Sequence, residues 1–242
     1  MGTAVSVDIR DRIEDADGAF GDVFAWLHSV DATFSTYKDD SEITRLQRGV
    51  ITRADASADV RFVLEECERL RDETDGYFDA YASGSLDPSG FVKGWSVEVA
   101  SSMLVERGST NHFINAGGDV RVRGVPEEGR FWNVGISDPS GLTSLRIVVS
   151  VTDAGVATSG TSERGAHVYD PHTLKPATAS SSVTIIGPEL AYTDAYATAA
   201  LAMGHRARHW LEGLPDHESY VIDAQGNEWS TLGFARCATT LV

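Results

Sequence analysis

Two side chains one helical turn apart, Asp194 and Thr198, have the chemistry of a magnesium site. The segment 191–203 has the apolar spacing of a helix, so residues four apart lie on one face. A carboxylate and a hydroxyl suit a hard cation such as Mg²⁺, which prefers oxygen ligands. A structural role also fits, in which Asp194 complements the helix dipole and Thr198 bonds back to the preceding turn. The spacing leaves both interpretations open.

A turn-rich stretch, 87–94, includes Asp87, Gly90 and Lys93 and leads into a helix expected from Trp95 onward. Backbone N–H groups at a helix N-terminus bind phosphate, and a lysine adds a positive charge. The alternative is a surface turn with a solvated lysine. The stretch is therefore a candidate phosphate site.

Gly117 and Gly118 come directly after an expected strand and before Asp119. Two glycines allow either the close approach of a ligand or a tight hairpin turn. The pattern is not the dinucleotide fingerprint Gly-x-Gly-x-x-Gly, and no crossover helix follows it. A ligand loop and a simple hairpin remain the two interpretations.

His167 stands between Ala166 and Val168 in a stretch that resembles an apolar strand. A histidine there is either a general base or a buried histidine with satisfied hydrogen bonds. Ser159, a little earlier, is not in the Gly-x-Ser-x-Gly context of a hydrolase nucleophile. No His or Cys spacing typical of zinc sites occurs.

The elements that must position these residues begin with helices and continue with strands. Helical spacing predicts helices over 20–30 and 60–70, the second capped by Ser57 or Asp59 and burying Cys67 on its apolar face. Alternation of apolar and polar residues predicts successive strands over 113–151. This order favours an α+β fold with mostly antiparallel sheets packed against helices. Shorter elements are expected as strands at 5–9, 156–157, 168–169, 183–186, 220–222 and near Phe234, and as helices at 95–104, 191–203 and 206–211.

Composition restricts the partners. The 242 residues include 20 Lys and Arg against 36 Asp and Glu, a formal charge of −16, which disfavours nucleic-acid binding. No run of about 18 apolar residues is present, so no membrane insertion is expected. The N-terminal residues lack the pattern of a signal peptide, and no lipidation cysteine lies near the start, so a cytoplasmic location is expected. We expect one domain over 1–242.

The combined motifs resemble those of the FAD:protein FMN transferases, the ApbE-like flavin transferases. The resemblance extends from residue 1 to about residue 204, and its order is more specific than any single motif. The matching stretches are 1–3, 35–37, 41–43, Phe78-Asp79, Asp87 with Lys93-Gly94, 115–119, 158–160, 167–171, and Asp194-Ala195 with Thr198.

The resemblance implies a reaction and a role for each matched residue. The family transfers FMN from FAD to a Thr or Ser hydroxyl of an acceptor protein and releases AMP. By resemblance, the Mg²⁺ ligands are Asp194, Thr198 and the Gly90 carbonyl, and His167 is the catalytic base. The FAD pocket would include Met1, Tyr37, Phe78, Asp79, Asp87 and Lys93, with Gly117, Gly118, Ser159 and Gly160 near the phosphates or the adenine.

The sequence departs from the family pattern in two places. Residues 80–82 read Ala-Tyr-Ala where the family usually has Pro-Thr, and the stretch from there to Asp87 is shorter than usual. Leu174 occupies a position where the family normally has glycine. Two alternatives stay open beside the transferase: an FAD pyrophosphatase that gives FMN and AMP, and a non-catalytic flavin-binding protein.

Overall fold

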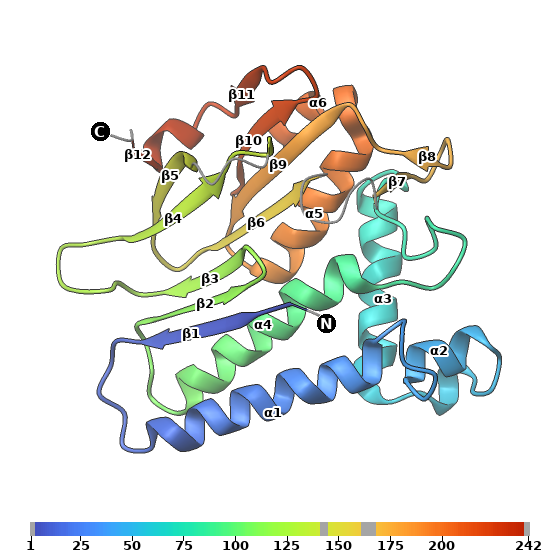
Figure 1. The fold of residues 1–242 in the computed structure, drawn as a ribbon, viewed down its shortest axis with the longest axis horizontal. Coiled ribbons are helices and arrows are strands. Elements are labelled where there is room, and N and C mark those ends of the chain that lie inside the picture. Colours follow the sequence, from blue (N-terminus) through green and yellow to red (C-terminus); the bar gives the residue numbers. More distant parts are fainter. Residues whose placement is uncertain (1–2, 141–144, 161–167, 240–242) are drawn as a thin grey trace.

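The computed structural model describes residues 3–140, 145–160 and 168–239. A seven-stranded sheet forms the centre, with helices on one face and a three-stranded sheet on the other (Figure 1). Every described strand pair is antiparallel, so the predicted α+β class with antiparallel sheets is confirmed. In the described ranges, no helix combines the length and the apolar character needed to cross a bilayer.

The central sheet has the strand order β1-β2-β3-β6-β9-β10-β11, the second sheet has the order β12-β5-β4, and β7 pairs with β8. The strands are β1 Val5–Ile9, β2 His112–Ala116, β3 Asp119–Arg123, β4 Trp132–Ser137, β5 Leu145–Val151, β6 Gly155–Gly160, β7 Tyr169–Asp170, β8 Lys175–Pro176, β9 Ser180–Gly187, β10 Glu218–Asp223, β11 Glu228–Ser230 and β12 Ala238–Thr239. The helices are α1 Ala16–Phe34, α2 Glu42–Gln47, α3 Ala58–Glu73, α4 Ser89–Glu106, α5 Leu190–Met203 and α6 Ala207–Glu212, with 3₁₀ turns at Arg53–Asp55, Gly204–Arg206 and Phe234–Arg236.

The alternation of side chains along the central strands separates two cores. On β10, Val221 packs into the core beneath the helices, while Tyr220 and Ile222 pack between the two sheets. On β6, Ala157 likewise packs into the core beneath the helices, and Val156 packs between the two sheets. Side chains of successive strand residues point to opposite faces, so both faces of the sheet are buried. The helical face is the one that receives α4 and α5.

The structure corrects three sequence expectations. Helix α4 begins at Ser89, well before the predicted start at Trp95, because the Asp87 carboxylate accepts a hydrogen bond from the Ser89 N–H (3.0 Å) and the helix glycines are packed against α5. Helix α2 was not predicted; Ser41 caps it by accepting a bond from the Thr44 N–H (3.1 Å). Phe234 starts a 3₁₀ turn rather than a strand.

Two local predictions are confirmed. Ser57 is the N-cap of α3, and its side chain accepts a bond from the Val60 N–H (3.4 Å). Cys67 lies on the buried face of the same helix, and burial raises the pKa of its thiol to about 12. A thiol held in its neutral form in an apolar core is inert, so Cys67 serves packing.

Candidate active site

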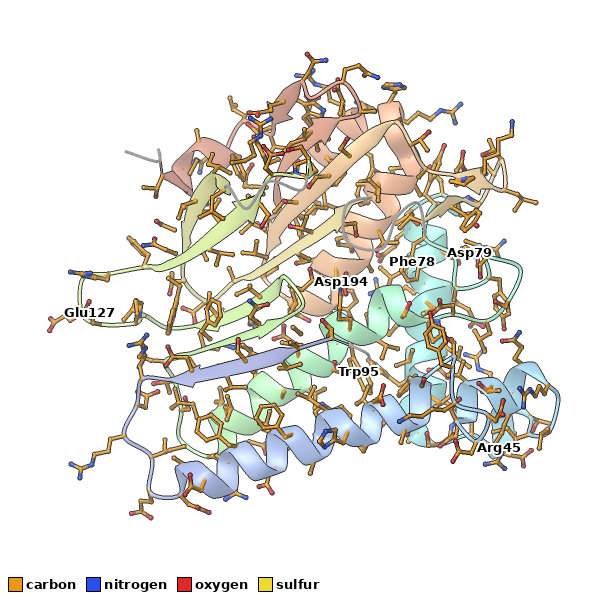
Figure 2. The ribbon with its side chains drawn as sticks, viewed as in Figure 1. Arg45, Phe78, Asp79, Trp95, Glu127 and Asp194 are labelled. Carbon is orange, nitrogen blue, oxygen red and sulfur yellow. The ribbon has the colours of Figure 1, made fainter. Side chains whose placement is uncertain are left out.

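Helices α4 and α5 cross in close contact, and the candidate site lies at their junction (Figure 2). A Cβ atom added at Gly94 would lie 2.5 Å from the Leu190 carbonyl oxygen and 2.9 Å from the Asp194 Cβ. A Cβ at Gly90 would lie 3.6 Å from the Thr198 Oγ1. Glycine at 90 and 94 therefore brings the backbone of α4 against the face of α5 that carries Asp194 and Thr198, four residues apart.

A cluster of three buried or half-buried charges fills this junction. The Asp119 carboxylate faces the Lys93 ammonium, which also lies 3.7 Å from the Asp194 Oδ1. The side chains of Asp119 and Asp194 are 1% and 3% exposed, and that of Lys93 is 25% exposed. Burial raises the pKa of Asp194 well above its usual value; Lys93 opposes the shift and Asp119 adds to it. Asp194 thus depends on neighbouring positive charge to stay ionised.

The strands supply the other side of the cluster. Asp119 is the first residue of β3, and its Oδ1 accepts a bond from the Thr158 N–H on β6 (3.0 Å). The next residue on β6, Ser159, has its Oγ 3.2 Å from the Thr198 Oγ1. Two strands and two helices therefore bring Lys93, Asp119, Ser159, Asp194 and Thr198 together.

The oxygen atoms of Asp194 and Thr198 are suitable ligands for a hard cation. Carboxylate and hydroxyl oxygens are the ligand types that Mg²⁺ takes in proteins, and it keeps several waters of its own. Among the described residues, no group of three or more His, Cys, Asp or Glu side chains is arranged to hold a metal ion. A metal here would therefore be held by few protein oxygens, from Asp194, Thr198 and backbone carbonyls, and by ligand or water. That arrangement fits Mg²⁺ and does not fit zinc.

The glycine pair at 117–118 forms the tight hairpin turn between β2 and β3. Both residues have positive φ, 59° and 96°, which favours glycine. The Asn115 side chain accepts a bond from the Gly118 N–H (2.9 Å), and a Cβ at Gly117 would lie 2.1 Å from the Thr3 Oγ1. The hairpin interpretation is thus confirmed, and the turn delivers Asp119 to the start of β3.

Phe78, Asp79 and Asp87 lie around the beginning of α4. The Phe78 ring would be 3.2 Å from a Cβ at Gly90, so it packs against the same face of α4 as Thr198. The carboxylate of Asp79 lies 3.5 Å from the Arg71 guanidinium. Figure 2 shows Phe78 and Asp79 on the α3 side of Asp194. Asp79 borders a cavity of about 430 Å³ lined by Leu46, Gln47, Arg53, Leu64, Cys67, Glu68, Arg71, Asp79, Ala80, Tyr81, Gly84, Ser85 and Leu86.

The remaining predicted site residues are not part of this cluster as the structure describes it. Tyr37 is in the loop between α1 and α2, and its side chain is 97% exposed. Met1 and His167 lie outside the described residues. Gly160 ends β6 next to Ser159, and a Cβ there would lie 2.9 Å from the Ser181 carbonyl oxygen. The geometry thus joins the predicted metal ligands to the predicted phosphate site through Lys93.

Sequence reasoning did not assign a role to Asp119, the buried partner of Lys93. The available signal was its position directly after the two glycines, at the start of a strand. Only the pairing of β3 with β6 places its carboxylate beside the helix junction, and that pairing joins residues far apart in the chain.

The family model for the ApbE family matches residues 1–84 and 80–221. The chain belongs to the ApbE family. Among curated relatives, this ApbE-family chain is 25% identical to the FAD:protein FMN transferase of Haemophilus influenzae, over 76% of this chain and 72% of the relative. It is 33% identical to the protein of that name from Treponema pallidum, over 52% of this chain and 40% of the relative.

Solved structures have the same fold. The flavin transferase ApbE from Vibrio cholerae superimposes with a TM-score of 0.86 at 21% identity, covering 98% of this chain and 96% of that one. The ApbE protein from Thermotoga maritima gives a TM-score of 0.87 at 19% identity, covering 99% and 97%. The ApbE-family fold therefore extends over nearly the whole chain.

Proposed function

We propose that this ApbE-family protein is a Mg²⁺-dependent flavin transferase that moves FMN from FAD to a Thr or Ser hydroxyl of an acceptor protein and releases AMP. Its curated relatives are named FAD:protein FMN transferase. The observation that carries the proposal is the junction of α4 and α5, where Lys93, Asp194 and Thr198 meet. An ammonium and hard oxygen ligands are what a diphosphate with a divalent cation requires.

The charges of the junction explain why a cation is needed. With both carboxylates ionised, Asp119, Asp194 and Lys93 leave one net negative charge in a protein whose total charge is −16. Such a site repels a diphosphate. A divalent cation reverses the local sign, and when bound it supplies charge neutralisation and Lewis acidity at the transferring phosphoryl group. FAD and Mg²⁺ are therefore expected to bind together.

The proposed metal ligands are Asp194, Thr198 and the carbonyl of Gly90. The Gly94 N–H donates to the Asp194 Oδ2 (3.0 Å). In a regular α-helix that N–H donates to the carbonyl four residues earlier, which here belongs to Gly90. Because the Asp194 carboxylate competes for the Gly94 N–H, the helical hydrogen bond to the Gly90 carbonyl oxygen is weakened. This supports the availability of that oxygen to a cation.

The remaining residues form the proposed FAD pocket. Lys93 offsets phosphate charge, and the Phe78 ring supplies an apolar wall beside Gly90. The cavity bordered by Asp79 has room for part of a large ligand. The other proposed contacts with FAD are Met1, Tyr37, Asp87, Gly117, Gly118, Ser159 and Gly160.

His167 is the proposed general base. A serine or threonine hydroxyl is a weak nucleophile, so a positioned base must take its proton as it attacks the FMN phosphorus. The new bond joins the acceptor oxygen to that phosphorus, while the bond from the same phosphorus to the bridging oxygen breaks. The bridging oxygen leaves with AMP, and the net products are the flavinylated acceptor and AMP.

The proposal is tested with purified protein, FAD, Mg²⁺ and a co-expressed candidate acceptor. We expect AMP release to depend on both Mg²⁺ and acceptor, and intact-mass measurement to show one FMN added on Thr or Ser. Rapid formation of FMN and AMP without acceptor would instead show a pyrophosphatase. Tight FAD binding without any turnover would show a flavin-binding protein.

A further inference from the structure

The face of β3 that meets the helices carries three charged residues at alternate positions. Asp119, Arg121 and Arg123 are each two residues apart, so their side chains leave the strand on the same face. Arg121 is 1% exposed and Arg123 is half-buried. Asp119 pairs with Lys93 of α4, so the strand already has one charged link to that helix. Arg121 and Arg123 need a carboxylate partner of their own, which would be a second charged link.

Glu98 of α4 supplies that second link. Its Oε1 lies 3.0 Å from the Arg121 Nε and 3.1 Å from the Arg123 Nη2. Its Oε2 accepts a hydrogen bond from the Leu190 backbone N–H (2.8 Å). One carboxylate, 15% exposed, thus connects α4 to β3 through one oxygen and to α5 through the other.

Leu190 is the first residue of α5, and its N–H has no partner within the helix. The N-cap residue, Glu189, makes no side-chain capping bond. Glu98 therefore performs the capping from a neighbouring helix, and its negative charge also suits the positive end of the α5 dipole. The start of the helix that carries Asp194 and Thr198 is tied to a side chain of α4.

The links between α4 and α5 follow one antiparallel register. Gly90 is opposite Thr198, Gly94 is opposite Asp194, and Glu98 is opposite Leu190. The first two contacts are made by glycine, which lets the two helix backbones approach closely, and the second includes the Gly94 N–H bond to Asp194. The third is a charged side chain held by partners on two elements, so it fixes the position of α4 against both α5 and β3.

We propose that Glu98 is a positioning residue that aligns α4, β3 and α5, so that Lys93, Asp119 and Asp194 converge on the cation and the diphosphate; this rests on the proposed function. Each of the three elements contributes one member of the charge cluster. Glu98 itself lies on α4, and its partners are two arginines on β3 and the first backbone N–H of α5. Glu98 is about 7.5 Å along α4 from Lys93, at 1.5 Å per residue. Glu98 acts through Lys93, Asp119 and Asp194 and needs no contact with the ligand.

The test compares wild type with Glu98→Gln, which keeps the size of the side chain and removes its charge. The first readout is binding of Mn²⁺ in the presence of FAD, followed by electron paramagnetic resonance; the second is Mg²⁺-dependent FMN transfer. We expect Glu98→Gln to weaken Mn²⁺ binding roughly 10–100-fold, the usual effect of losing a residue that orients metal ligands. Glu98→Asp should recover part of the affinity because it keeps the charge.

Two further variants separate positioning from folding. Glu98→Gln leaves the buried Arg121 without its carboxylate, so a variant that fails to fold is replaced by Glu98→Gln with Arg121→Met, which removes both charges. The control is Leu104→Ala, which destabilises the buried face of α4 away from the junction and should leave Mn²⁺ affinity of the folded protein unchanged.

The outcomes are distinct. The proposed function itself would be overturned if the wild-type protein neither bound Mn²⁺ in the presence of FAD nor transferred FMN. If wild type is active, wild-type Mn²⁺ affinity in folded Glu98→Gln, or in the charge-neutral pair, would overturn the role of Glu98. An equal loss of affinity in Leu104→Ala would also overturn it, because general destabilisation would then be the cause.

Discussion

The backbone N–H of Gly94 donates a hydrogen bond to the Asp194 Oδ2 at 3.0 Å, across the contact between α4 and α5. One atom of a helix backbone thus orients the carboxylate on which the proposed cation site depends. The bond exists only because position 94 has no side chain, since a Cβ there would meet the Leu190 carbonyl oxygen and the Asp194 Cβ. The close contact between α4 and α5 and the orientation of the Asp194 carboxylate therefore both depend on Gly94.

The first prediction concerns Gly94→Ala. The added methyl would lie 2.5 Å from a backbone oxygen, which cannot rotate away as a side chain does, so the helices must separate. We expect a loss of about 1–3 kcal/mol of unfolding free energy, as in other overpacked cores, and loss of FMN transfer even where the variant is folded. Urea unfolding and transfer assays on the same sample check this.

Gly21→Ala in α1 is the matched control for that substitution. A Cβ at Gly21 would have no neighbour within 4 Å. Alanine favours the helix over glycine by about 0.5–1 kcal/mol, so this variant should be slightly stabilised and fully active. Equal behaviour of the two variants would show that the contact at Gly94 does not matter.

The second prediction concerns the proposed metal ligands. Asp194→Asn keeps an acceptor for the Gly94 N–H but removes the charge, so the fold should survive and Mg²⁺-dependent transfer should fall. Losing about 3 kcal/mol of the stabilisation that a metal supplies slows a reaction roughly 10²-fold. Thr198→Val should be milder, since water can replace one neutral ligand. Transfer rates over a Mg²⁺ titration, with thermal melts, measure both; full wild-type activity in excess chelator would contradict the metal role.

Part of the fold and of the site could be predicted from the sequence, because it depends on the pattern of residues close together in the chain. The apolar spacing of α3 and its Ser57 cap, the hairpin turn at 117–118 and the facing of Asp194 and Thr198 all involve residues close in the chain. Each follows from the geometry of one helix or one turn.

The rest depends on contacts between distant segments. Helix α4 starts earlier than its spacing suggests because Gly90 and Gly94, unfavourable in an isolated helix, are compensated by close packing against α5. Asp119 becomes a partner of Lys93 only through pairing of β3 with β6. Glu98 carries no sequence pattern of its own. Such residues are recognised only once the sheet and the helix pair are in place.

The third prediction concerns His167, the proposed base, which lies outside the described residues. His167→Ala should keep FAD and Mg²⁺ affinity while transfer slows roughly 10²–10⁴-fold, the usual contribution of a general base. A buried structural histidine would behave otherwise: its loss would lower the melting temperature, and activity would follow the folded fraction. Transfer rate and thermal stability on one sample decide between the two roles, and a near wild-type rate would refute the assignment.

The last prediction concerns His112 at the start of β2, whose side chain is fully buried. Its Nε2 lies 2.7 Å from the Ser101 Oγ and its Nδ1 lies 3.2 Å from the Ser109 Oγ. The pKa of His112 is lowered to about 4, chiefly by burial and also by the nearby Arg123 and Arg121, against the opposing effects of a hydrogen bond with the Ser109 backbone and the charge of Asp11. The folded protein therefore keeps this imidazole neutral where an unfolded chain would charge it.

Between the unfolded pKa of about 6.5 and the folded pKa, the unfolded chain binds the extra proton, so falling pH favours unfolding. The contribution of His112 is fully present above pH 6.5 and is lost as the pH falls toward 4. From pH 7.5 to pH 5 we expect a loss of about 2 kcal/mol in unfolding free energy from this group. His112→Gln cannot take up the proton, so its stability deficit relative to wild type should shrink by that amount over the same interval. Urea unfolding of both proteins at several pH values, with the exposed His209→Gln as the control substitution, measures the difference; a deficit independent of pH would mean that His112 is protonated equally in the folded and unfolded states.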